Sequence, residues 1–179
     1  MFKLARIDLA GFKDLLTQWE PHFDGDSGLL YDHCRPFLDH AERICGEKPQ
    51  DPTYGIWALI DENGGKKTYE GFTHINHKLP RTPHAEVRLV WNALHPRYEN
   101  ELKPETLAQF TVSYIVGAIK LAKGDLLAQS VRIYLGNATD RSYAQGIVAS
   151  MKSEMNGTSP IEFAGNWLHI VDVTKIDVS

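Results

Sequence analysis

The segment from Ala85 to Ala122 constrains the fold most, because it reads as a strand, a loop and a long helix in succession. Residues 85–94 are rich in strand-forming side chains. Pro104 suits a first helical turn, since its missing N–H would be unpaired there anyway. The residues after it form one apolar face at helical spacing: Leu107, Phe110, Tyr114, Ile115, Ala118, Ile119 and Ala122.

Further strands flank this segment on both sides. Residues 131–135 follow the helix, and a strand–helix–strand crossover places its two strands side by side and parallel. Residues 54–60 and 68–76 precede it, with the hairpin signal Asn-Gly-Gly at residues 63–65 between them. Together with residues 85–94 they predict an antiparallel meander.

The two ends of the chain supply the remaining elements. Residues 2–7 predict a strand, and Asp8 is a candidate N-cap for a helix that ends near Trp19. A second helix is predicted over residues 29–45, with Pro36 expected to kink it or divide it into two short helices. The C-terminal part predicts a helix and two strands, at residues 141–152, 161–163 and 167–173. The result is a single α/β domain over residues 1–179, with helices packed on a mixed sheet.

Composition makes several classes of partner unexpected. The formal net charge of −4 gives no basic excess, so we do not expect nucleic acid as a partner. No stretch approaches the ~20 apolar residues of a membrane-spanning helix, and the N-terminal residues lack the apolar centre of a secretory signal. Cys34 and Cys45 make no disulfide framework, so we expect a cytoplasmic protein that does not bind membranes.

Metal and nucleotide motifs are also missing from the sequence. It contains no CxxC, GxSxG, Walker or GxGxxG pattern, and we predict no metal site. His74 and His77 would face opposite sides of a regular strand, which argues against joint metal binding. We expect the histidines of this region, which include His84 and His95, to be partly exposed polar groups.

Residues 84–96, HAEVRLVWNALHP, resemble the fourth strand of the GNAT acyltransferase superfamily, and the two closing strands are similar to the usual ending of those proteins. The resemblance implies a mostly antiparallel central sheet with parallel strands four and five and helices on both faces. It also implies an acyl-CoA-dependent N-acyltransferase. The cofactor would be acetyl-CoA or another acyl-CoA, and the acceptor a small-molecule or peptide amine.

The resemblance also implies where the cofactor would bind. In this superfamily strands four and five splay apart, and the thioester arm of the cofactor lies in the gap against main-chain groups of strand four. Here that role would fall to the backbone of Trp91, Asn92 and Leu94. The pyrophosphate would lie at the N-terminus of the following helix, where free N–H groups and the helix dipole favour an anion.

The loop before that helix departs from the family pattern. Residues 97–105 contain no glycine, although glycines let the backbone come close to a phosphate. Three carboxylates, on Glu99, Glu101 and Glu105, stand against the cations of Arg97 and Lys103. Two interpretations stay open: a capped helix start without a phosphate site, or an unusual cofactor pose that uses Arg97 and Lys103.

Two residues match catalytic positions of the superfamily. Glu86 matches a strand-four glutamate that takes the proton from the amine; alternatively, it faces solvent or pairs with Arg88 or a neighbouring strand. Tyr143 matches a tyrosine that protonates the departing thiolate, with Asn137 as its companion. In the alternative interpretation Asn137 is a turn residue and Tyr143 packs in the core.

Two classes of function follow from these residues. The first is direct acyl transfer to an amine, favoured by the joint presence of Glu86, Asn137 and Tyr143. The second is a GNAT-like binding or assembly module without catalysis, favoured by the acidic loop. Trp167, on a terminal strand, could form part of a homodimer face.

Overall fold

The structure is a computed structural model that describes residues 2–23, 28–47, 51, 53–62, 66–78, 85–98, 103–136, 141–146, 148, 149 and 160–177. For residues 28–33 and 78 it describes the backbone alone. Within these ranges no helix is long and apolar enough to cross a membrane.

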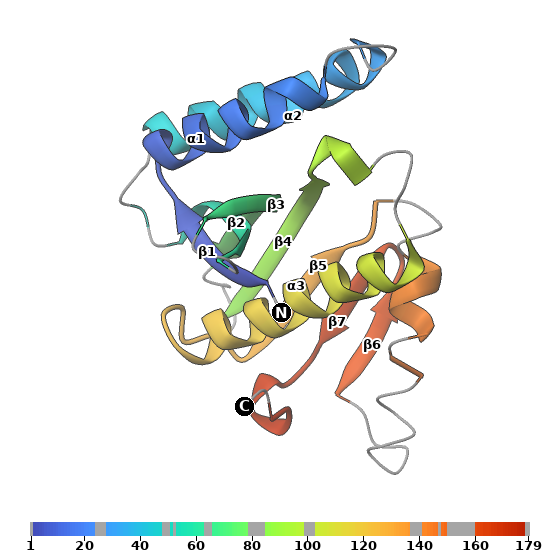
Figure 1. The fold of residues 1–179 in the computed structure, drawn as a ribbon. Helices are drawn as coiled ribbons and strands as arrows, with labels where there is room; N and C mark the ends of the chain where they lie inside the picture. Colours follow the sequence, from blue (N-terminus) through green and yellow to red (C-terminus); the bar gives the residue numbers. More distant parts are fainter. Residues whose placement is uncertain are drawn as a thin grey trace.

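The described strands form one seven-stranded sheet in the order β1-β2-β3-β4-β5-β7-β6 (Figure 1). β4 and β5 run parallel, and every other neighbouring pair is antiparallel, as the meander and the crossover predict. The strand bounds are β1 (Lys3–Ile7), β2 (Tyr54–Asp61), β3 (Thr68–Lys78), β4 (Glu86–Leu94), β5 (Ser130–Tyr134), β6 (Ile161–Ala164) and β7 (Trp167–Ile170).

Helices cover both faces of the sheet. α1 (Leu9–Trp19) and α2 (Gly28–Glu47) lie side by side on one face, and α3 (Pro104–Lys123) lies on the other (Figure 1). Residues 141–146 are also helical. Asp8 caps α1 as predicted, because its Oδ1 accepts a hydrogen bond of 2.8 Å from the backbone N–H of Gly11.

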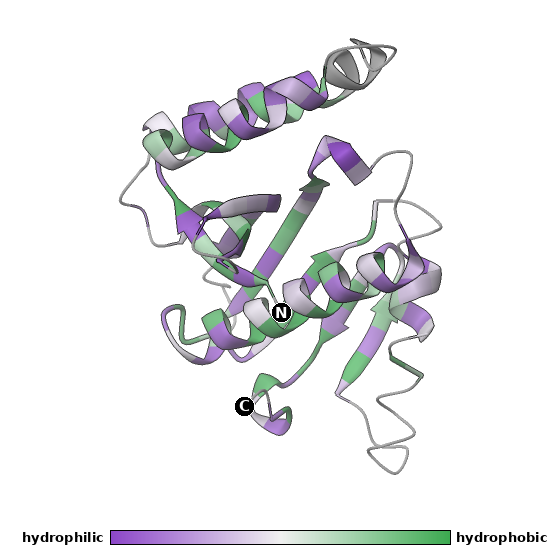
Figure 2. Cartoon of the chain, in the orientation of Figure 1, coloured by the Kyte–Doolittle hydropathy of each residue, from purple (hydrophilic) through white to green (hydrophobic). Residues whose placement is uncertain are grey.

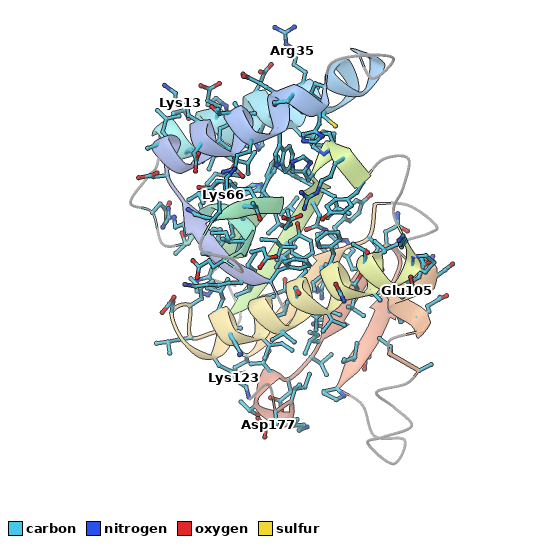
Figure 3. All side chains as sticks on the ribbon, viewed as in Figure 1. Lys13, Arg35, Lys66, Glu105, Lys123 and Asp177 are labelled. Atoms are coloured by element: carbon cyan, nitrogen blue, oxygen red, sulfur yellow. The ribbon has the colours of Figure 1, made fainter. Side chains whose placement is uncertain are left out.

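Two hydrophobic clusters, one on each face, hold these layers together. Trp57 and Leu59 of β2 pack in the cluster beneath α3, whereas Ile56 and Ala58 pack in the cluster beneath α1 and α2. Hydrophilic residues cover the outer side of α1 and α2 (Figure 2). Lys13 and Arg35 project outward from that side (Figure 3). The central strands are therefore apolar on both faces, which explains why β2 lacks a polar–apolar alternation.

The predicted break at Pro36 is wrong, since α2 runs through this residue as one helix. Pro36 lies on the exposed side, while Leu38, Ala41 and Ile44 bury the opposite side against the sheet. Tertiary packing thus outweighs the local cost of the proline.

The last predicted strand is also too long. β7 ends at Ile170, and a short 3₁₀ helix, η4 (Val173–Lys175), follows it. The Asp172 Oδ1 accepts hydrogen bonds from the Thr174 backbone N–H, at 3.0 Å, and from the Thr174 hydroxyl, at 2.6 Å. This local cap turns the chain away from the sheet.

Candidate functional site

β4 and β5 separate part-way along their length. Their parallel pairing extends from Glu86 and Ser130 to Leu89 and Ile133, although β4 itself continues to Leu94. The pairing of β4 with β3 skips Val90, so one extra residue is inserted in β4 at the point where the two strands part. Such a bulge bends a strand and redirects the side chains beyond it. The sequence therefore builds a splay at the C-terminal half of β4.

A cavity of about 190 Å³ occupies the splay on the α3 side of the sheet. Its walls come from α3, β4, β7 and the end of β5, and most of them are apolar. The lining residues are Asn92, Leu94, Leu107, Phe110, Thr111, Tyr114, Ile115, Ile133, Tyr134, Leu135 and Leu168. Apolar walls with a few polar groups are typical of small-molecule sites.

Two polar side chains in these walls contact strand backbone. The Asn92 side-chain amide donates a hydrogen bond of 3.3 Å to the Tyr134 carbonyl, across the gap between β4 and β5. The Tyr114 hydroxyl donates one of 3.3 Å to the Phe72 carbonyl. Burial raises the pKa of Tyr114, so its phenol stays neutral. Gly71 makes room for this phenol, because a Cβ there would lie 2.8 Å from the Tyr114 oxygen.

The sequence matches no protein-family model and no curated protein, so structural likeness decides the fold. AtaTR bound with AcCoA superposes with a TM-score of 0.52 at 13% identity, over 94% of this chain and 91% of that one. The chain has a GNAT-like fold. A ribosomal-protein-serine acetyltransferase from Vibrio cholerae, described as putative, gives 0.49 at 10% identity, over 94% and 92% of the two chains. The PaiA N-acetyltransferase from Thermoplasma acidophilum with coenzyme A gives 0.46 at 12%, over 94% and 96%.

The GNAT-like splay contains two of the three backbone positions predicted to hold the thioester arm. Asn92 and Leu94 line the cavity. Trp91 is not among the lining residues; its ring packs on the opposite face, against Phe37 and His74, with centroid distances of 5.6 and 5.8 Å. Its carbonyl accepts a hydrogen bond of 2.9 Å from the Thr73 hydroxyl. Successive side chains of a strand point to opposite faces, so Trp91 and Asn92 lie on opposite faces of the sheet.

The Arg97 side chain does not extend toward the start of α3. It pairs with Glu70 of β3, whose side chain is only 2% exposed. The Tyr98 hydroxyl donates a hydrogen bond of 2.5 Å to the same carboxylate. Together they anchor the short 3₁₀ helix η3 (Pro96–Tyr98) that follows β4. Sequence reasoning missed Glu70, because it falls at a bulge of β3 that no local signal marks.

The start of α3 carries charges of both signs. Lys103 is exposed and occupies the N-cap position without a capping hydrogen bond from its side chain. Glu105 is exposed in the first turn, at the end of α3 far from Lys123 (Figure 3). Glu99 and Glu101 lie outside the described residues.

Glu86 lies at the paired end of β4, away from the splay. Its carboxylate pairs with Arg88 on the same strand and, at 2.8 Å, with Arg132 on β5. The Nε2 of His169 lies 3.9 Å away, and the Glu86 side chain is 12% exposed. Asn92 is six residues further along the strand, roughly 20 Å at about 3.3 Å per residue. The structure therefore does not bring Glu86 to the cavity.

The predicted acid and its companion lie in the segment after β5. Tyr143 is half-buried in the helical residues 141–146 and is not among the residues that line the cavity. Ala144 of the same segment packs in the core beneath α3. Asn137 lies outside the described residues.

The expectation that the histidines are partly exposed is wrong for the three that the structure describes. His74, His77 and His95 are all buried. Both ring nitrogens of His74 lack a hydrogen-bond partner among the described residues. Burial, reinforced by His40, lowers the pKa of His74 to about 4; burial and then Arg97 lower that of His95 to about 4. His84 lies outside the described residues.

Proposed function

We propose that this protein is an acyl-CoA-dependent N-acyltransferase, and the splay between β4 and β5 is the observation that carries the proposal. The bulge at Val90 opens the sheet, and the cavity behind it is mostly apolar. An acyl-thioester arm combines methylene groups with amides. It therefore fits apolar walls that also include the Asn92 side chain, beside the part of β4 that extends beyond its pairing with β5.

The reaction joins an amine to the acyl carbon. The amine nitrogen attacks the thioester carbonyl and loses one proton, the carbon–sulfur bond breaks, and the sulfur leaves as a thiolate that takes up one proton. The cavity lies on the α3 side of the sheet, and in this proposal the acceptor approaches from the face that carries α1 and α2. Holding the thioester against β4 fixes its orientation for this attack.

The two predicted proton-transfer residues take different places in this proposal. Tyr143, in the helical segment after β5, is the proposed donor to the thiolate. Glu86 has its carboxylate bound by two guanidinium groups at the other end of β4. We therefore assign Glu86 the role of joining β4 to β5. A substitution of Glu86 tests directly whether it also acts as the general base.

Binding of acetyl-CoA tests the proposal. Calorimetric titration should give a saturable heat, and the ligand should raise the melting temperature by mass action. Thr111→Phe fills the cavity from α3 and should weaken binding by about tenfold or more. Val112→Phe adds the same ring one residue along the helix, at a position that does not line the cavity, and should leave binding unchanged. Absence of any stabilisation at millimolar acetyl-CoA would sink the proposal.

A further inference from the structure

We infer that this protein recognises its donor through the acyl-pantetheine arm, and that the nucleotide and pyrophosphate of CoA add no affinity. The inference rests on the proposed function and narrows its donor class. Any acyl thioester of pantetheine has the required group, whether it is free, part of CoA or attached to a carrier protein. Four features of the chain lead to this donor class.

The first feature is the backbone before α3. A pyrophosphate at a helix N-terminus needs several free N–H groups and a backbone that can approach closely, which glycine allows. The sequence has no glycine between Gly71 and Gly117, a range that contains all of β4, the loop and the first half of α3. Pro104, the first residue of α3, has no N–H to donate.

The second feature is the engagement of Arg97. Its guanidinium pairs with the Glu70 carboxylate, which is buried and also accepts hydrogen bonds from Tyr98 and, at 2.9 Å on its other oxygen, from Thr68. Turning Arg97 toward a phosphate would remove the only cation that the structure places on Glu70 among the described residues. A buried carboxylate without its cation is strongly unfavourable. Arg97 is therefore a structural residue and does not serve as a phosphate ligand.

The third feature is the charge around the start of the helix. Lys103 is exposed next to Glu105, and the sequence adds Glu99 and Glu101 to the same loop. Since Arg97 is neutralised by Glu70, three carboxylates stand against one lysine. CoA carries several negative charges on its pyrophosphate and ribose phosphate, and like charges repel one another.

The fourth feature is the splay itself, where the acyl-pantetheine arm of the donor would bind. The cavity is bounded by Leu94, Phe110 and Ile133, and Asn92 supplies an amide at the gap. Among the residues that the structure describes, none of those that line it carries a formal charge. Binding energy is therefore available for methylene and amide groups, and not for phosphates.

Paired titrations test the inference. Acetyl-CoA and acetyl-pantetheine should bind with dissociation constants within about threefold of each other. Neither dissociation constant should rise between low and high salt, because the protein makes no attractive phosphate contact for salt to screen. Acetyl-CoA binding more than about tenfold tighter than acetyl-pantetheine overturns the inference but leaves the proposed function standing. Binding of neither thioester overturns both.

A charge variant adds a second test. Glu105→Lys should strengthen acetyl-CoA binding severalfold in a salt-dependent way and leave acetyl-pantetheine unchanged. Gln109→Lys, one turn further along α3 and also exposed, is the matched control and should change neither. An equal change for both ligands in Glu105→Lys overturns the assignment of repulsion to this helix end.

Turnover measured with three donors distinguishes the molecules that could carry the acyl-pantetheine arm. The three donors are acetyl-CoA, acetyl-pantetheine and a carrier protein loaded with acetyl-phosphopantetheine. A kcat/KM with the carrier protein at least equal to that with acetyl-pantetheine supports recognition of the shared arm. Turnover with acetyl-CoA alone overturns it.

Discussion

The Glu70 carboxylate on β3 pairs with the Arg97 guanidinium on η3, and this contact anchors η3 to β3 just after the end of β4. Glu70 is 1% exposed overall, so its charge is desolvated and depends on its partners. The same contact holds η3 against β3, and η3 is the last described element before α3, the helix that covers the cavity.

Loss of the cation should therefore destabilise the protein. Arg97→Met leaves the buried carboxylate unpaired and should lower the free energy of unfolding by about 3 kcal/mol, measured by urea denaturation. Arg43→Met removes an exposed pair with Glu47 and should cost less than about 1 kcal/mol. Similar losses for the two variants would contradict a special role for Glu70.

Glu86→Gln separates stability from catalysis. The variant loses the charge that binds Arg88 and Arg132, and should lower the free energy of unfolding by roughly 2 kcal/mol. Turnover per folded molecule should stay within about threefold of the wild type, because the carboxylate lies far from the splay. A fall in kcat of about 100-fold with unchanged stability would restore Glu86 as the general base.

Gly71→Ala should disturb the wall of the cavity. The added Cβ would lie 2.7 Å from the Ala93 carbonyl oxygen and 2.8 Å from the Tyr114 oxygen, so the strands or the phenol must shift. We expect a loss of about 1–3 kcal/mol in unfolding free energy and weaker donor binding. Gly146→Ala is the control, because nothing lies within 4 Å of its added Cβ and alanine favours a helix.

Stability should fall in mild acid. His74 and His95 have pKa values of about 4 in the folded protein, below the ~6.5 of an unfolded histidine. Between about pH 4 and about pH 6.5 the unfolded state therefore binds more protons than the folded state. The contribution of the neutral rings to the free energy of unfolding is complete above about pH 6.5. As the pH falls to about 4, each ring's contribution decreases by on the order of 3 kcal/mol.

His74→Leu tests how much of this pH dependence comes from the His74 ring. Its unfolding free energy, measured by denaturant titration across this range, should depend on pH less steeply than that of the wild type. An unchanged slope would show that His74 does not titrate between the two states.

Much of the fold follows from local signals. Asp8 caps α1 because an aspartate oxygen reaches the free N–H groups of a first turn in any context. Pro104 opens α3 because its fixed backbone angle suits that position. The strand pattern and the crossover rule were enough to predict the meander and the parallel pair β4–β5.

The candidate site was predicted less completely. The backbone positions at Asn92 and Leu94 were predicted through the family resemblance, and both line the cavity. Tyr114 was predicted as a core residue of the α3 face, and no local pattern indicated that its hydroxyl would reach β3. Glu86 matched a family position, but its place relative to the splay depends on where β4 and β5 stop pairing.

The sequence alone thus determined the order of helices and strands and showed that glycines are missing before α3, while the resemblance to a known superfamily implied the GNAT-like topology. The order of the elements depends on backbone preferences within a few residues of each position. Only the tertiary structure decided that α2 continues through Pro36, that Arg97 is held by Glu70, and that Glu86 binds Arg132. Each of these depends on burial and charge between residues far apart in the chain, and no local pattern in the sequence records them.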